Sequence, residues 1–157
     1  MTTEVCRTNL QIRASEALAQ AERLCVECGT RLTHLRRCVL EIVWYSRTPI
    51  GAYAILDVLR EDGRRGAPPT VYRALDFPQE QGLVHRLASL NAFVGCCHPA
   101  HSHGSQFLIC SSCGRVSEMH ESRVEQAICD EAAACGFLVQ FQRLEVVGLC
   151  TDCRANE

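Results

Sequence analysis

Residues 68–96 read PPTVYRALDFPQEQGLVHRLASLNAFVGC, and this stretch decides the fold. It opens with two prolines, which the first turn of a helix tolerates because its N–H groups have no partner within the helix. Apolar residues then recur at i, i+3 and i+4, as on one face of a helix. After Gly82 the period changes to two, and residues 83–87 and 92–96 flank a short turn. The stretch therefore predicts a helix followed by a β-hairpin.

Three further helices are predicted before this stretch, at residues 15–29, 33–47 and 51–63. The first is expected to begin with Ser15 as its N-cap, because a serine hydroxyl accepts from the free N–H groups of a first turn. Several short helices followed by a hairpin suggest a winged helix-turn-helix. In that fold the last helix enters the DNA major groove and the hairpin, called the wing, lies along the DNA backbone.

The apolar face of the last helix leaves Thr70, Tyr72 and Arg73 directed toward solvent. Arginine bonds a guanine edge with two hydrogen bonds, and the hydroxyls of Thr and Tyr suit phosphates. An ordinary amphipathic helix with an exposed arginine has the same pattern. DNA contact at these three residues is therefore a hypothesis.

The 157 residues allow one domain or a pair, and the net charge of −2 argues against a simple polycation that coats nucleic acid. Residues 1–90 hold 12 Arg against 10 acidic residues, whereas residues 91–157 hold 4 against 8. The N-terminus lacks the apolar run of a signal peptide, and no segment approaches the roughly 18 apolar residues of a membrane helix. We expect a cytoplasmic protein with no membrane partner.

The second part of the chain is predicted to be a small α+β unit, so the fold class is α+β with two domains, 1–90 and 91–157. Its expected elements are two short strands, a helix and a long strand, at residues 105–110, 114–119, 121–136 and 137–150. About 65 residues make a thin core. A metal ion or a partner subunit is therefore expected to stabilise it.

Twelve cysteines in a cytosolic chain favour metal binding, because that compartment keeps thiols reduced. Cys110 and Cys113 form one CxxC motif, and Cys150 and Cys153 form another after 36 intervening residues. Two such pairs make a closed, tetrahedral zinc site with four thiolate ligands. A redox CxxC is the rival, but it would need a thioredoxin-like βαβ context that the pattern lacks.

A second metal site is predicted from the hairpin. If Leu90 and Asn91 form a two-residue turn, the numbers of facing residues sum to 181, and His85 stands opposite Cys96 with Cβ atoms about 5 Å apart. A shift by one residue would place the two side chains on opposite faces. Thiolate with imidazole favours zinc over iron(II) or manganese.

Further candidate ligands follow the hairpin. Histidines 98, 101 and 103 lie in the next loop, and Glu118 and His120 lie on the strand after the first CxxC. Residues 96–114 alone contain four cysteines and three histidines, a density that isolated surface histidines do not explain. A third metal site built from Cys97, His98, His101 or His120 stays open.

The segments RLTHLR, PPTVYRALD, GLVHR, ICSSCG and GLCTDC occur in an order and spacing that match a family. The chain resembles the ferric uptake regulator family of bacterial metalloregulators, and most closely its zinc-sensing branch. The resemblance runs from about residue 15 to residue 153 and covers nearly the whole chain.

The resemblance implies a homodimeric, zinc-dependent repressor of zinc-uptake genes that binds double-stranded operator DNA. It implies a winged-helix domain, a hinge near residue 90, a C-terminal dimerisation domain and two zinc ions per chain. The structural ligands would be Cys110, Cys113, Cys150 and Cys153. The regulatory ligands would be His85, Cys96, His103 and Glu118. Tyr53 and Arg73 fall at positions associated with base contacts, with Thr70 and Tyr72 beside them.

Two rival functions are weighed against this one. An iron or peroxide sensor of the same family would bind its metal mainly through His and carboxylate ligands, so Cys96 discriminates. A zinc enzyme would need an open coordination position and a general base, and the chain has no HExxH motif. We therefore expect no enzymatic activity.

Two residues depart from the family pattern. His34 replaces a proline that is usual in the segment RLTPxR. Pro78 stands at i+7 from Val71, where the family has an apolar helix residue. Because proline cannot donate a backbone hydrogen bond, the last helix is expected to end near Asp76 or to kink.

Overall fold

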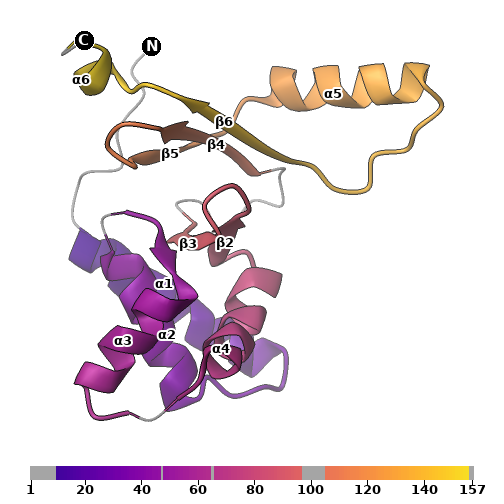
Figure 1. Ribbon diagram of the computed structural model, residues 1–157. Helices are drawn as coiled ribbons and strands as arrows, with labels where there is room; N and C mark the ends of the chain where they lie inside the picture. The colour runs from indigo at the N-terminus through magenta and orange to yellow at the C-terminus, as the bar shows by residue number, and fades with distance from the viewer. Residues whose placement is uncertain (1–9, 47, 65, 97–104, 156–157) are drawn as a thin grey trace. The chain divides into compact units, whose positions relative to one another are not determined.

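The computed structural model describes residues 10–46, 48–64, 66–96 and 105–155, with side chains from residue 14 onward. The chain forms two compact units, residues 1–100 and 101–157, and each is described by itself (Figure 1). The division follows Ala100 rather than residue 90, because strand β3 (Ala92–Gly95) pairs with strands of the first unit. Among the described residues, no helix is long and apolar enough to cross a lipid bilayer.

The described residues of the first unit form four helices: α1 (Leu10–Glu27), α2 (His34–Tyr45), α3 (Ala52–Glu61) and α4 (Pro68–Glu80). The predicted start of the first helix was wrong, because α1 begins five residues before Ser15 and Ser15 lies inside it. The predicted start of the second is confirmed, since Oγ1 of Thr33 accepts from the backbone N–H of Arg36 at 3.3 Å.

Helix α4 does not end near Asp76 but continues through Pro78 to Glu80. Phe77 and Pro78 are both buried, and the guanidinium carbon of Arg36 lies 5.4 Å from the centre of the Phe77 ring. Packing of these two side chains therefore holds the last turn in place although proline disfavours it.

The core of the first unit joins all four helices to the wing. Its largest fully buried side chains include Leu40 of α2, Ile55 of α3 and Leu75 of α4, together with Phe93 of β3. Tyr72 packs against this core with its ring edge-on to Phe93, at 6.1 Å between centroids. The prediction that Tyr72 faces solvent is thus wrong in part, because the residue is partly buried against the core.

The wing is a three-stranded antiparallel sheet in the order β1-β3-β2, with β1 at Ile50–Gly51 and β2 at Val84–Leu87. The predicted hairpin is confirmed, but its register was wrong. Facing residues sum to 179, so His85 is opposite Val94. The turn has four residues, 88–91, and Asn91 takes a positive φ of 46°. The error is two residues, so each side chain keeps the face that was expected.

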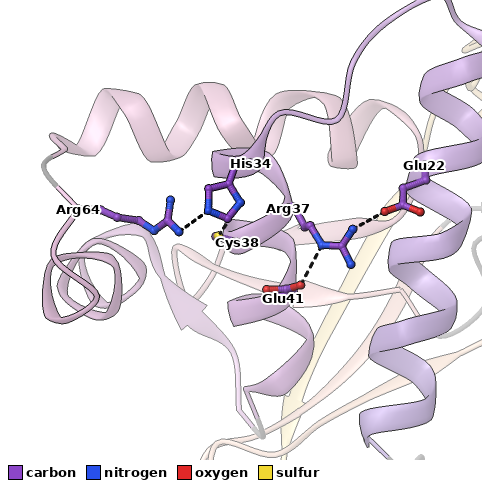
Figure 2. A network of polar contacts seen from close by, with 6 residues as sticks. All are labelled: Glu22, His34, Arg37, Cys38, Glu41 and Arg64. Carbon is purple, nitrogen blue, oxygen red and sulfur yellow. Dashed lines mark hydrogen bonds and ion pairs between the residues drawn. The ribbon is translucent and has the colours of Figure 1, made fainter.

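Polar contacts tie helix α2 to its neighbours (Figure 2). Arg37 forms an ion pair with Glu22 of α1 and a second, 3.2 Å long, with Glu41 of its own helix. Nη2 of Arg64 donates to Nε2 of His34 at 2.6 Å, and Nδ1 of His34 lies 3.9 Å from Sγ of Cys38. His34 thus links the start of α2 to the segment between α3 and α4.

Where the structure describes it, the second unit is a three-stranded sheet with two helices. The strands are β4 (Ser105–Cys110), β5 (Val116–Met119) and β6 (Arg143–Gly148), and the helices are α5 (Ser122–Ala134) and α6 (Thr151–Arg154). The strands follow the order β5-β4-β6, with β4 and β6 parallel and β4 and β5 antiparallel. The predicted long strand at 137–150 is confirmed only in part, because β6 is six residues long.

Much apolar surface of the second unit is exposed. No described residue of α5 is buried, and Phe137, Leu138 and Phe141, which follow it, are 67%, 81% and 68% exposed. Val146 and Val147 on the edge strand β6 are exposed as well. The thin core expected from the sequence is therefore what the unit has.

Candidate metal centres

Four cysteine sulfurs converge at one end of the second unit. The Sγ atoms of Cys110, Cys113, Cys150 and Cys153 all lie within 4.8 Å of one another. The Sγ atoms of Cys113 and Cys150 are 3.8 Å apart. Zinc–sulfur bonds of 2.3 Å in a tetrahedron place the sulfurs about 3.8 Å apart, so this donor set fits a zinc ion.

The parallel pairing of β4 and β6 explains how two motifs far apart in the sequence meet. Cys110 ends β4 opposite Gly148, the last residue of β6, so both CxxC motifs leave the sheet at the same end. The backbone N–H of Ser111 then donates to the Gly148 carbonyl at 2.8 Å, and that of Cys150 donates to Sγ of Cys110 at 3.4 Å. Backbone pairing therefore brings the four cysteines together. Strand β5 and helix α5 belong to the 36 residues that separate the two CxxC motifs in the sequence.

The thiols of this site differ in acidity. Backbone hydrogen bonds from Cys113 and Cys150 lower the pKa of Cys110 to about 6. A side-chain hydrogen bond from Ser112 also acts to lower the pKa of Cys153, but contacts with the Cys150 and Cys113 sulfurs outweigh it and raise that pKa to about 12. Four thiolates this close together repel one another, so the cluster resists losing all four protons. A cation bound between the sulfurs would offset this repulsion.

A salt bridge crosses between the two motifs and was not anticipated from the sequence. Nη1 of Arg115, two residues after Cys113, lies 2.8 Å from Oδ2 of Asp152, inside the second CxxC. The hydrogen bond that Arg115 donates to this carboxylate raises the pKa of Arg115. Arg115 follows its motif whereas Asp152 lies inside the other one, so the spacing of the motifs carried no signal for this pair.

The wing carries the second candidate centre. A ring nitrogen of His85 on β2 and Sγ of Cys96, which directly follows β3, lie within 4.8 Å of each other. The backbone N–H of Cys96 donates to the Leu83 carbonyl at 3.0 Å, so the ladder of the hairpin extends to this residue. The predicted pairing of these two residues is diagonal rather than direct, yet both side chains share one face of the sheet.

The other predicted regulatory ligands lie elsewhere in the chain. Glu118 belongs to β5 of the second unit, where its Oε1 is 3.8 Å from Nε2 of His120. His103 lies outside the described residues, as do Cys97, His98 and His101 of the possible third site. The described structure thus brings together His85 and Cys96 in one unit, and Glu118 and His120 in the other.

Comparison with known proteins identifies the family. The sequence profile of the Ferric uptake regulator family matches residues 27–147. The chain belongs to the ferric uptake regulator family. It is 43% identical to the zinc uptake regulation protein of Escherichia coli strain K12 over 140 residues, which cover 88% of this chain and 81% of that protein.

Solved structures of the family agree with this assignment. A structure of a zinc uptake regulator complexed with zinc and DNA is 41% identical, with a TM-score of 0.84 over 91% of this chain and 96% of that one. The crystal structure of holo XcZur is 45% identical, with a TM-score of 0.79 over 90% and 99% of the two chains. The first unit is therefore the family's winged-helix domain, and the second is its dimerisation domain.

The winged-helix domain presents the residues expected to contact DNA on two helices. Tyr53, in the first turn of α3, is 67% exposed, and Arg73 on α4 is exposed as well. Thr70 and Tyr72 on α4 are half-buried. Arg73 and Tyr53 therefore offer the most accessible side chains of this predicted set.

Proposed function

We propose that this chain is a zinc-responsive transcriptional repressor, which binds operator DNA as a dimer when its regulatory site holds zinc and thereby controls zinc-uptake genes. The observation that carries the proposal is the thiolate and imidazole pair of Cys96 and His85, placed on the DNA-binding wing of a ferric uptake regulator fold. A metal held there acts on the element that reads DNA.

Zinc is the metal that the donor atoms favour. A site with four thiolates is typical of structural zinc, and its sulfurs have the spacing of a tetrahedral zinc site. We assign Cys110, Cys113, Cys150 and Cys153 as the ligands of a structural ion. The similarity to zinc uptake regulators supports the same metal.

We assign a second, regulatory ion to His85 and Cys96 from the wing and to His103 and Glu118 from the dimerisation domain. The last two ligands rest on the resemblance to the zinc-sensing branch. Ligands from both domains would make the orientation of the two DNA-reading helices depend on zinc. A preference of a few kcal/mol for the DNA-binding orientation changes operator occupancy by severalfold to a hundredfold, and DNA must tighten zinc binding equally.

Dimerisation is supported by the apolar surface of the second unit. An exposed patch that includes Phe137, Leu138 and Phe141 next to an edge strand is the kind of surface that a second subunit covers. Two copies related by a twofold axis then present their two α4 helices to a palindromic operator. Tyr53, Thr70, Tyr72 and Arg73 are assigned as the DNA-contacting residues.

The rival functions fit the described sites less well. A sensor of iron or peroxide in this family would use mainly histidine and carboxylate ligands, whereas Cys96 supplies a thiolate beside His85. The family is one of transcriptional regulators, and we assign the chain no enzymatic activity. Because its target is operator DNA, we place the protein in the cytoplasm.

The test is a DNA titration with controlled zinc. A duplex selected from a random library by the zinc-loaded protein is titrated in buffered free zinc and again in chelator strong enough to empty only the weaker site. Operator affinity is expected to fall at least tenfold without zinc, which corresponds to about 1.4 kcal/mol. Equal affinity in both buffers contradicts the proposal. Arg73→Ala serves as a control that loses DNA binding but keeps its zinc.

A further inference from the structure

The backbone of the wing lies directly against the ring of Trp44. Gly95 is the last residue of β3, and a Cβ atom built on it would lie 2.7 Å from both Cδ2 and Cε2 of Trp44 and 3.1 Å from Cε3. Side-chain carbons do not approach other atoms this closely. No residue other than glycine therefore fits at position 95 while the indole ring keeps its place.

The indole ring is held firmly by its surroundings. Trp44 lies in the last turn of α2, is only 7% exposed, and belongs to the buried core of the first unit together with Val84 and Phe93 of the wing. Interiors are close-packed and yield little to small changes in volume. The ring thus forms a rigid surface against which the end of β3 rests.

The residue that rests beside this surface directly precedes a proposed zinc ligand in the sequence. Gly95 pairs with Val84, directly before His85 on β2, and directly precedes Cys96. A shift of the β3 backbone at Gly95 is therefore passed to the Cys96 sulfur, while His85 stays on the neighbouring strand.

We propose that Trp44 and Gly95 form a positioning pair that fixes Cys96 relative to His85 and so sets the zinc affinity of the regulatory site. This inference rests on the proposed function, since it deepens the account of that site. Ordinary van der Waals contact begins at about 3.4 Å, so an added methyl group would push the backbone back by about 0.7 Å. Metal–ligand distances tolerate only about 0.2 Å, so this displacement is large enough to weaken the site.

The experiment uses the full-length protein with one equivalent of zinc in its four-cysteine site, titrated with cobalt(II) as the probe of the second site. Thiolate coordination gives cobalt a charge-transfer band, and its visible absorption reports tetrahedral geometry. These signals report on the ligand sphere, which a purely structural role would leave unchanged. The variants are Gly95→Ala, Trp44→Phe and the two combined.

The control is Gly51→Ala in the same sheet. A Cβ atom there meets only the Asn91 carbonyl oxygen, at 3.8 Å, which is ordinary contact. Its cobalt affinity is expected to equal that of the wild type. Circular dichroism of each variant checks that the chain is folded, and the occupied four-cysteine site in the other unit serves as an internal reference.

Gly95→Ala is expected to lower cobalt affinity at the second site roughly tenfold and to weaken the charge-transfer band. Phenylalanine keeps a ring carbon near the position of Cδ2, but its ring is smaller than the indole and the space left lets it tilt away from β3, so Trp44→Phe makes room for the new methyl group. The combined variant is therefore expected to recover most of the lost affinity. Trp44→Phe alone keeps the ligand strand in place and is expected to change affinity by less than about threefold.

Two results overturn the inference alone: Gly95→Ala binds cobalt as tightly as Gly51→Ala, or the combined variant stays as weak as Gly95→Ala. If Gly95→Ala does not fold, the combined variant decides. A cobalt affinity within threefold of that of Trp44→Phe alone supports the pair, and a larger loss contradicts it. If the wild type takes up no second ion at all, the proposed regulatory site fails and the inference fails with it.

Discussion

Replacing Pro78 is expected to stabilise the winged-helix domain. Helix α4 runs through this residue to Glu80, so the missing N–H leaves the Ala74 carbonyl without its helical donor, and proline inside a helix costs about 3 kcal/mol relative to alanine. Because position 78 is buried, the larger leucine of Pro78→Leu adds volume that costs about 1–3 kcal/mol. The net gain is about 1 kcal/mol.

A gain of about 1 kcal/mol raises the melting temperature of a domain of this size by about 4–8 °C. The assay is thermal unfolding of the zinc-loaded protein, followed by circular dichroism and by the fluorescence of the single tryptophan. Pro78→Ala removes the ring without adding volume, so it is expected to stabilise the domain as well. Together the two variants separate the backbone effect from packing.

Pro69→Ala is the matched control. Pro69 lies in the first turn of the same helix, where the missing N–H has no intrahelical acceptor, so its replacement is expected to bring no stabilisation. A melting temperature at or below that of the wild type for both Pro78 variants would refute the reasoning. It would mean that the packing of the proline ring outweighs the lost hydrogen bond.

Three further predictions address the sites. Cys96→Ser is expected to reduce the zinc content measured by mass spectrometry from two ions per chain to one, and retention of two ions would contradict the ligand assignment. Arg73→Ala is expected to weaken operator binding about tenfold to a hundredfold in a fluorescence titration with unchanged zinc content; loss of zinc would show that the residue acts on the fold instead. Asp152→Asn breaks the 2.8 Å ion pair with Arg115. Because the Asp152 side chain is 62% exposed, solvent screens the pair and its contribution is small. The rate of zinc transfer to a chelator is therefore expected to rise by no more than about fivefold. A hundredfold acceleration would show that the pair is essential to the site.

Local patterns carried most of the prediction of the fold. The helical spacing before Gly82 and the alternation after it gave α4 and the hairpin, because both signals lie within a few turns of the residues they describe. The two-residue strand β1 was missed because it is too short to show alternation. Its existence depends on pairing with β3, which begins 41 residues after Gly51, and no local pattern records that partner.

Helix ends and turn geometry were predicted less well, for two physical reasons. Of the two predicted alternatives for α4, an end near Asp76 was wrong, because burial of Phe77 and Pro78 outweighs the local preference of proline. The hairpin register was two residues off because the segment before Ala92 forms a four-residue turn, with Asn91 in the left-handed region. His85 and Cys96 still share one face of the sheet, because side chains alternate with a period of two and the register is shifted by two residues.

The sites were predictable to the extent that their ligands are close in sequence or on neighbouring strands. The spacing within the two CxxC motifs predicts a four-thiolate site. The parallel register of β4 with β6 then brings the two motifs together at one end of the sheet. The contact of Trp44 with Gly95 joins residues 51 positions apart, and neither residue type suggests it. Complementary shape between distant residues is visible only once the chain is folded.

The two candidate metal centres differ in where their ligands lie, and we expect this difference to account for the separate roles proposed for them. All four cysteines of the proposed structural site lie within one unit, and backbone hydrogen bonds at Cys110 and Cys150 bring the two motifs together, so we expect the site to be assembled whenever that unit is folded. Among its described residues the wing contributes His85 and Cys96, and two ligands are too few for a closed tetrahedral site. Under the proposed assignment, part of the binding free energy would be spent on bringing in ligands from another part of the chain. We therefore expect the regulatory site to bind zinc more weakly than the four-cysteine site and to empty first as zinc falls, which is the property that a sensor needs and that a structural site must lack.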